Sequence, residues 1–226
     1  MNYLNHIAFI MDGNSSWAIL NNRPKMDGYL KGMQNMSKTI LNVKDLGIKY
    51  ATFYAFSSEN WNRPKSWVSE FMRLALNFFR NDSSIKAVLD AKAKLKVIGD
   101  KTKLSQEIQD ILNEYEEKTK DNTNIVVQLA ISYGARDEIV RTINKISKLG
   151  LEASEENISN NLDTAGIPDP DMIVRTSGKQ RLSNFLLWQA AYSEFYFSDL
   201  LWPDFDKTEL QNAINEFSNR KRTYGK

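Results

Sequence analysis

Residues 6–18 read HIAFIMDGNSSWA, and this stretch decides the fold class. Its apolar run Ile7–Met11 is cut off by Asp12, Gly13 and Asn14, a pattern that predicts a buried β-strand ending in a carboxylate on a tight turn. In α/β folds, ligands bind at the carboxyl ends of the strands. A carboxylate there, followed by two hydroxyls, suits Mg²⁺ held beside a phosphate, whereas the plainer interpretation is that Asp12 caps a helix or a turn.

The rest of the chain alternates similar strand patterns with helical patterns. Short apolar runs predict strands at Ile7–Met11, Ala51–Phe56, Leu95–Ile98, Ile125–Ile131 and Met172–Thr176. Amphipathic patterns predict helices at residues 28–46, 66–93, 103–119, 135–149, 183–192 and 206–219. This alternation favours one α/β domain over residues 1–226, with a central, mostly parallel sheet flanked by helices.

The composition excludes several functional classes. The chain has no cysteine, so disulfides, thiolate metal sites and cysteine catalysis are excluded. His6 is the only histidine and precedes a predicted strand, which argues against a Ser-His-Asp triad and a multi-histidine metal site. A net charge of +2 is too small to give the strongly positive surface typical of nucleic-acid-binding proteins. The chain start lacks a signal-peptide pattern, and no apolar run approaches the ~20 residues of a spanning helix, so we expect a cytoplasmic protein.

The predicted helix that follows Pro64 has an unusually wide apolar face. The face is compatible with a deeply buried core helix or with the wall of a hydrophobic tunnel, and periodicity does not separate the two. The residues that share this face are Trp67, Phe71, Leu74, Ala75 and Phe78.

A dense polar and aromatic cluster, YAFSSENWNRP, follows the second predicted strand at residues 54–64. Because parallel strands end at the same edge of a sheet, this loop is expected to approach Asp12. Ser58, Asn60 and Arg63 suit an anion and Trp61 suits the flank of a substrate. The alternative is an ordinary loop in which proline opens a helix.

The last predicted strand runs into a basic segment, RTSGKQRLSN, at residues 175–184. Arg175 and Arg181 bracket a glycine turn, and Ser183 or Asn184 is expected to cap the next helix. Helix N–H groups and guanidinium forks bind anions, so the segment predicts a diphosphate site, with a solvated basic loop as the alternative. It matches neither a Walker loop nor a dinucleotide fingerprint, which disfavours a nucleotide-binding module.

Glu194 lies between aromatic residues in the stretch YSEFYF at residues 192–197. Burying a carboxylate without a partner is costly. Either Glu194 faces solvent on an edge strand or it holds a cation.

In this order, the motifs resemble those of the cis-prenyltransferase family, which includes bacterial undecaprenyl diphosphate synthases. The motifs are HIAFIMDGN, YAFSSENWNRP, the Tyr133–Asp137 stretch, RTSGKQRLSNFLLWQ and YSEFYFSDLLWPDF. The resemblance implies an α/β homodimer that uses Mg²⁺ to condense isopentenyl diphosphate onto an allylic diphosphate such as farnesyl diphosphate. The implied product is a long Z-polyprenyl diphosphate such as undecaprenyl diphosphate, a cell-wall carrier lipid. That product would draw the enzyme into peripheral contact with the inner face of the membrane.

The resemblance also implies roles for individual residues. Asp12 corresponds to the Mg²⁺-linked carboxylate at the allylic diphosphate, and Glu194 to a second one, from the partner subunit or from the same site. The implied catalytic residues are Asp12, Asn14, Asn60 and Arg63. The implied substrate-binding residues are Gly13, Ser15, Ser16, Trp17, Lys25, Tyr29, Ser58, Trp61, Arg175, Arg181 and Ser183.

The chain departs from the family pattern at several of these positions. Ser15 and Ser16 stand where the family usually has Gly and Arg, and Lys25 stands in place of another Arg. Tyr29 replaces a His, and Lys179 replaces an acidic residue. A serine offers one neutral donor where a guanidinium offers a charged fork. The alternative hypothesis is therefore a weakly active or non-catalytic relative that serves as a partner subunit.

Overall fold

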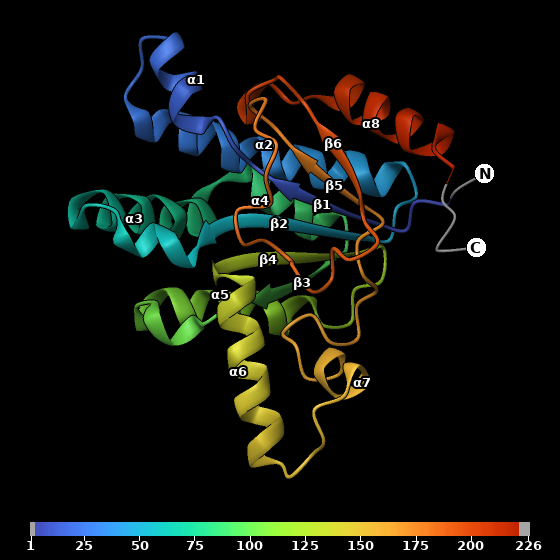
Figure 1. Cartoon of the computed structure of the whole chain (residues 1–226). Helices are drawn as coiled ribbons and strands as arrows, with labels where there is room; N and C mark the ends of the chain where they lie inside the picture. The colour runs from blue at the N-terminus through green and yellow to red at the C-terminus, as the bar shows by residue number, and fades with distance from the viewer. Residues whose placement is uncertain (1–2, 222–226) are drawn as a thin grey trace.

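The computed structural model describes residues 3–221 and is built on one parallel sheet (Figure 1). Its six strands lie in the order β3-β4-β2-β1-β5-β6, and every neighbouring pair is parallel. The strands are β1 (His6–Ile10), β2 (Tyr50–Ser57), β3 (Ala93–Ile98), β4 (Ile125–Tyr133), β5 (Met172–Arg175) and β6 (Glu194–Phe197).

Helices cover both faces of this sheet. The α-helices are α1 (Asn14–Leu20), α2 (Lys25–Asp45), α3 (Lys65–Asn81), α4 (Ser83–Asp90), α5 (Gln106–Thr119), α6 (Ala135–Lys148), α7 (Glu155–Ser159) and α8 (Lys207–Asn219). Three short 3₁₀ helices are η1 (Ser58–Asn62), η2 (Lys101–Lys103) and η3 (Trp202–Asp204). Among residues 3–221, no helix combines the length and apolar character needed to cross a membrane.

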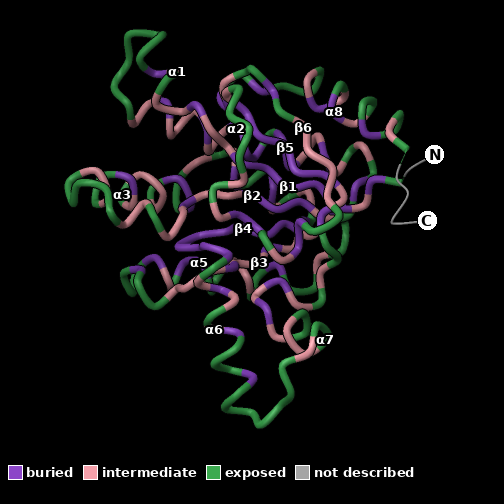
Figure 2. The backbone as a smooth tube through the Cα atoms, viewed as in Figure 1, coloured by how far each residue is buried: buried purple, intermediate pink, exposed green. Residues whose placement is uncertain are grey.

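Successive side chains of β1 pack into two different cores. Ile7 and Phe9 join the larger cluster with α2, α3, α4, α5 and α8. Ala8 and Ile10 face the other cluster, with the start of α6 and the 185–190 segment. All five residues of β1 are therefore buried, as expected for a central parallel strand covered on both faces (Figure 2).

The structure confirms the predicted parallel α/β architecture and all the predicted strands, and it adds β6 at the edge. The helix predicted over 66–93 is wrong, because Asp82 is extended and separates α3 from α4. Its carboxylate accepts a hydrogen bond from the Ser84 N–H at 2.8 Å and so begins α4.

The helix predicted over 183–192 is also wrong, because this segment consists of turns. Ser183, Asn184 and Leu186 have φ angles of 50°, 63° and 45°. A right-handed helix does not accommodate such left-handed residues. Ser183 and Asn184 therefore do not begin the predicted helix; instead, Asn184 Oδ1 accepts a hydrogen bond from the Arg136 N–H at 3.0 Å, in the first turn of α6.

Candidate active site

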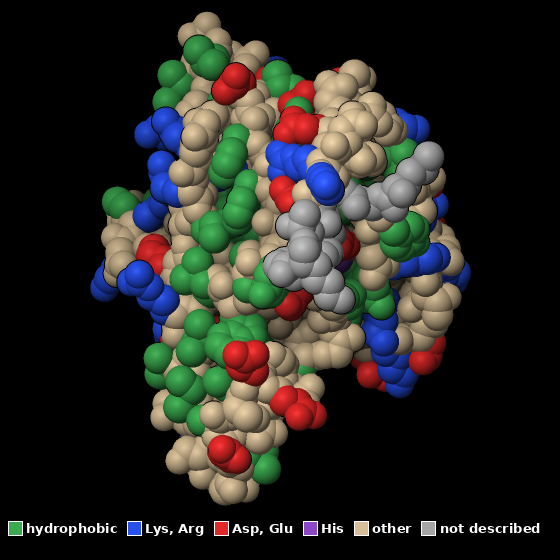
Figure 3. Space-filling model, turned by 45° about the vertical axis from the view of Figure 1, so that its right-hand side comes forward, with side chains coloured by type: hydrophobic (Ala, Val, Ile, Leu, Met, Phe, Trp, Pro, Cys, Tyr) green, Lys and Arg blue, Asp and Glu red, His purple; other side chains and the backbone are tan. Residues whose placement is uncertain are grey.

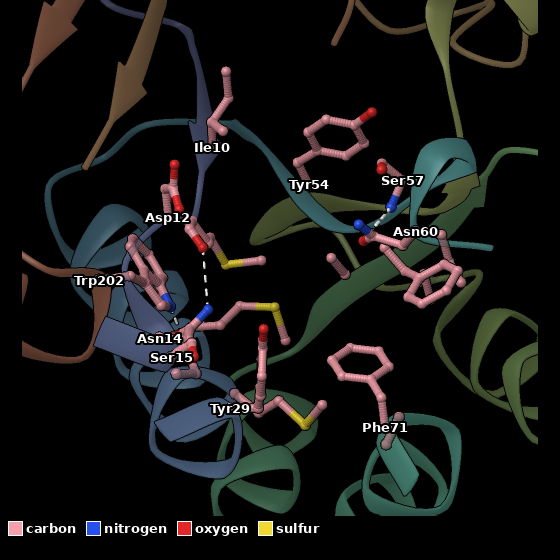
Figure 4. A pocket seen from close by; sticks show the side chains of 18 of the residues that line it. Ile10, Asp12, Asn14, Ser15, Tyr29, Tyr54, Ser57, Asn60, Phe71 and Trp202 are labelled. Atoms are coloured by element: carbon pink, nitrogen blue, oxygen red, sulfur yellow. Dashed lines mark hydrogen bonds between the residues drawn. The ribbon is translucent and has the colours of Figure 1, made fainter. Parts of the chain in front are cut away.

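A cavity of about 730 Å³ opens at the carboxyl ends of β1, β2 and β5, between α2 and α3 (Figure 4). One end, which we call the mouth, is polar and includes Asp12, Lys25, Asn60, Arg175 and Arg181. The remainder, which we call the interior, is apolar. Its wall includes Met33, Met36, Trp67, Phe71, Met72, Ala75, Phe78, Phe79, Ile108 and Leu129. Most of the apolar face predicted for the helix after Pro64 thus lines a cavity, which supports the tunnel interpretation.

Asp12 is fixed where β1 ends and the chain turns through Gly13, which has a φ of 105°. Its backbone N–H donates to Thr176 Oγ1 at 3.0 Å, and its carbonyl accepts from the Trp202 N–H at 3.0 Å. Its carboxylate accepts from the Gly13 N–H at 2.9 Å and from Arg175 Nη2 at 2.8 Å. The side chain is 37% exposed, so the carboxylate remains open to the mouth.

Arg175 joins Asp12 to the basic loop that follows β5. Its side chain is only 4% exposed. Nη1 donates to Ser183 Oγ at 2.8 Å and to the carbonyl of Arg181, while Nη2 pairs with Asp12. One planar guanidinium therefore holds the Asp12 carboxylate and the basic loop in a single arrangement.

Asn14 is held against α2 by two glycines. A Cβ on Gly28 would lie 2.1 Å from the Asn14 carbonyl, and a Cβ on Gly32 would lie 2.1 Å from Asn14 Oδ1. The Asn14 amide donates to the Met11 carbonyl at 3.1 Å, while Oδ1 has no hydrogen-bond partner within the described part of the chain. Only glycine at both positions lets α1 approach α2 this closely.

The η1 segment brings Asn60 and Arg63 to the cavity. Asn60 Oδ1 accepts from the Ser57 N–H at 3.1 Å and so fixes the turn after β2 (Figure 4). Arg63 contacts Tyr29 of α2, because its Nη1 donates to the Tyr29 hydroxyl at 3.1 Å. Ser58 points to Glu59, at 3.1 Å from its carboxylate, and does not line the cavity.

Three further predicted site residues also lie off the cavity wall. Trp61 donates to Ser132 Oγ at 3.0 Å, and Trp17 donates to Asp204 at 2.8 Å. Glu194 pairs with Arg220 at 2.8 Å. Glu194 is the first residue of β6 and pairs with Met172, whereas Phe197, the last residue, pairs with Arg175. Glu194 therefore lies at the amino ends of the parallel strands, whereas Asp12 follows the carboxyl end of β1. Placement of Glu194 beside Asp12 of the same chain is therefore wrong, and a contribution from a partner subunit stays a prediction.

The remaining predicted residues line the cavity together: Asp12, Gly13, Asn14, Ser15, Ser16, Lys25, Tyr29, Asn60, Arg63, Arg175, Arg181 and Ser183. Of the two substituted lysines, Lys25 lines the mouth, whereas Lys179 does not line the cavity. The sequence did not single out Tyr54 as a site residue, although it begins the YAFSSENWNRP motif. Its hydroxyl donates to the carbonyls of Tyr133 at 3.1 Å and Ser183 at 3.3 Å, and burial raises its pKa, which keeps the hydroxyl a donor.

The cavity has the electrostatics of an anion site. In the described lining, four cations (Lys25, Arg63, Arg175 and Arg181) face the single carboxylate of Asp12. Residues 3–221 contain no cluster of three or more His, Asp or Glu side chains that would hold a metal unaided. Mg²⁺ is commonly bound by one or two carboxylates together with substrate phosphates and water, so Asp12 in this mouth fits Mg²⁺ only in company with a phosphorylated ligand.

Comparisons with known proteins agree along the whole chain. The sequence profile of the undecaprenyl diphosphate synthase family matches residues 10–225. An isoprenyl transferase of Clostridium tetani is 43% identical over 97% of this chain and 88% of its own length. One of Agrobacterium fabrum is 44% identical over 97% and 91%.

Two crystal structures share the fold. A lavandulyl diphosphate synthase from Lavandula x intermedia, in complex with dimethylallyl diphosphate, superposes with a TM-score of 0.92. It is 34% identical, over 99% of this chain and 98% of its own. A probable undecaprenyl diphosphate synthase from Campylobacter jejuni superposes with a TM-score of 0.85 at 38% identity, over 100% of both chains.

Proposed function

The chain belongs to the undecaprenyl diphosphate synthase family of cis-prenyltransferases, and from this membership we propose that it extends farnesyl diphosphate with isopentenyl diphosphate in a Mg²⁺-dependent reaction. The proposed product is a long Z-polyprenyl diphosphate such as undecaprenyl diphosphate. One observation carries the proposal, namely a cavity with a cationic mouth around Asp12 that continues into an apolar interior. An allylic diphosphate has the same two-part character.

The mouth suits two diphosphates side by side. Arg181 and Ser183 follow β5 at one side, while Ser15, Ser16 and Lys25 belong to α1 and α2 at the other. We assign the first group to isopentenyl diphosphate and the second to the allylic diphosphate. Fixed donors of this kind stabilise the charge that develops on a departing diphosphate, and removing one such donor typically lowers the rate by about 10²–10³-fold.

Asp12 is the residue that would hold Mg²⁺, with the oxygens of a bound diphosphate. When bound, the ion supplies charge neutralisation for the leaving diphosphate. The Arg175 guanidinium orients the Asp12 carboxylate toward the mouth through their 2.8 Å contact. Lys25 keeps a positive charge where the family usually has Arg, without its bidentate fork.

The interior suits the growing hydrocarbon. Each CH₂ group removed from water contributes about 0.8 kcal/mol, so drawing one five-carbon unit inward favours elongation by a few kcal/mol. The walls from α2 and α3 present methionine and aromatic side chains to this tail. Elongation and burial of the tail are thus coupled.

Asp12→Asn tests the proposal. Purified chain with Mg²⁺, farnesyl diphosphate and labelled isopentenyl diphosphate is expected to form a polyprenyl product, analysed for length by mass spectrometry. EDTA and Asp12→Asn are each expected to lower incorporation at least 10²-fold. Asp110→Asn, on the exposed face of α5, is the matched control and is expected to act as wild type. Folded wild-type protein that incorporates no label with any metal or primer would favour the non-catalytic partner subunit instead.

We also propose a homodimer in which Glu194 reaches the partner's site. Figure 3 shows hydrophobic side chains along one side of the surface. Large exposed apolar residues on α6, on the 186–192 segment and on the edge strand β6 suit a subunit contact; they are Val140, Ile143, Leu187, Tyr192 and Phe197. Sedimentation at micromolar concentration is expected to give twice the mass of the chain, and a monomer there would refute the dimer.

Mixing two inactive variants tests the role of Glu194. A heterodimer of Asp12→Asn and Glu194→Gln has one site with both carboxylates intact if Glu194 acts across the dimer, and none if it acts within its own chain. Unfolding and remixing the two variants is therefore expected to restore activity. Absence of recovery from proven heterodimers would exclude the action of Glu194 across the dimer.

The product also bears on location. A polyprenyl diphosphate is apolar over nearly its whole length, so we propose that it brings the enzyme into peripheral contact with the membrane. Flotation with phospholipid vesicles is expected only when the enzyme is loaded with product. Equal flotation of the unloaded enzyme would show that the product is not the link.

A further inference from the structure

A cluster of four aromatic side chains forms part of the cavity wall next to Arg63. Tyr29 comes from α2, Trp67 and Phe71 from α3, and Phe56 from β2; we call them the aromatic collar. The Tyr29 ring lies edge-on to Trp67 and to Phe71, each at 5.5 Å between centroids. Phe71 is 5.3 Å from Trp67 and 5.3 Å from Phe56. Figure 4 shows Tyr29 and Phe71 projecting into the same space from the two helices.

Arg63 rests on this collar. Its guanidinium lies 4.2 Å from the centre of the Trp67 ring, and its Nη1 donates to the Tyr29 hydroxyl at 3.1 Å. Within residues 3–221, Arg63 forms no ion pair with a carboxylate. A guanidinium carries five N–H donors, so most of them remain for an anion in the mouth.

We propose that Tyr29 is a positioning residue that holds Arg63 on the collar, where its guanidinium receives the allylic diphosphate whose tail passes into the interior. This inference rests on the proposed function and deepens it. Arg63 is exposed and has a long side chain, so without its contacts to Trp67 and Tyr29 it would sample many rotamers. The Trp67 face and the Tyr29 oxygen reduce that freedom before the substrate arrives.

The chemistry of Tyr29 explains why it suits this task. A phenol supplies a neutral oxygen acceptor and an apolar ring on one side chain. Tyr29 thus serves Arg63 with its hydroxyl and the hydrocarbon tail with its ring, without transferring a proton itself.

Tyr29→Phe removes only the hydroxyl and keeps the collar. We expect the KM for farnesyl diphosphate and the Kd for inorganic diphosphate, measured by calorimetry with Mg²⁺, to rise about 3–10-fold. The kcat and the KM for isopentenyl diphosphate are expected to stay within about twofold. Tyr196→Phe is the matched control. Tyr196 is on β6, its hydroxyl donates to Glu209 at 3.0 Å, and it does not line the cavity.

A double-mutant cycle separates positioning from direct binding. If Tyr29 acts through Arg63, Tyr29→Phe has no further effect on the Kd for inorganic diphosphate in the Arg63→Gln background. An unchanged Kd in the single variant, or an equal increase in both backgrounds, would overturn the inference, as would wild-type protein that binds no diphosphate. The titration needs no turnover, so a chain that binds diphosphate without forming product refutes the proposed function while still deciding the role of Tyr29.

Discussion

Arg175→Lys tests the contacts by which Arg175 joins Asp12 to the basic loop, because it keeps the positive charge and removes the planar guanidinium. The guanidinium reaches Asp12 on one side and the Arg181–Ser183 loop on the other through separate nitrogens. A lysine has a single ammonium group, which keeps contact with one side at most. The variant therefore separates the effect of charge from that of geometry.

The structure sets the size of the expected effect. Hydrogen bonds to charged groups contribute about 1.5–3 kcal/mol each, and the lysine loses the bonds to one side. Because the side chain is 4% exposed, water does not replace them. We expect part of this loss as lower stability and the rest as a fall of about 10²–10³-fold in kcat/KM for isopentenyl diphosphate, since the basic loop is no longer held beside Asp12.

The assay is steady-state incorporation of labelled isopentenyl diphosphate, with thermal unfolding measured on the same preparations. Arg80→Lys is the control, because Arg80 forms an exposed 2.8 Å pair with Glu107 and does not line the main cavity. The free energy of unfolding of the Arg80→Lys variant is expected to differ from that of the wild type by less than about 0.5 kcal/mol. Folded Arg175→Lys with wild-type kcat/KM would refute the reasoning, as would a loss explained entirely by its unfolded fraction.

Two further predictions concern packing and acid. Gly32→Ala places a Cβ 2.1 Å from Asn14 Oδ1, so overpacking of about 1–3 kcal/mol is expected to outweigh the gain of about 1 kcal/mol in helix propensity. A lower Tm and a higher KM for farnesyl diphosphate would support this, and two unchanged values would contradict it. Burial lowers the pKa of His6 from 6.5 to about 4, so the folded state prefers the neutral imidazole. The contribution of His6 to the free energy of unfolding is fully present above about pH 6.5. This contribution, about 3 kcal/mol, is lost as the pH falls toward 4. Urea unfolding at pH 7.5 and 4.5 measures this, and His6→Gln is expected to lose less on acidification.

Much of the site was predictable from the sequence, because its residues follow strands. Asp12 and Asn60 come after two apolar runs and Arg175 lies at the end of a third. Parallel strands in neighbouring positions end at one edge of the sheet, so these residues gather there. The wide apolar face after Pro64 was visible too, although its periodicity did not distinguish a core helix from a cavity wall. The cavity between α2 and α3 resolves that ambiguity.

Other features depend on how distant segments meet. The helical pattern over 183–192 is overridden by left-handed residues. Ser183 also contacts Arg175 at the end of β5 and Tyr54, which lies 129 residues away in the sequence. Glu194 lies within a motif that resembles those of the family, yet the register of β6 places it at the amino ends of the parallel strands, away from Asp12.

The hydrophobic pattern of this chain determined the parallel α/β sheet and the edge at which its polar loops gather. The pairing of Tyr29 with Arg63, the approach of Asn14 to Gly32 and the separation of Glu194 from Asp12 were decided only by the tertiary structure. The physical reason is that local periodicity reports which side of an element is buried, whereas the partner of a polar group depends on strand register and helix packing between segments far apart in the chain.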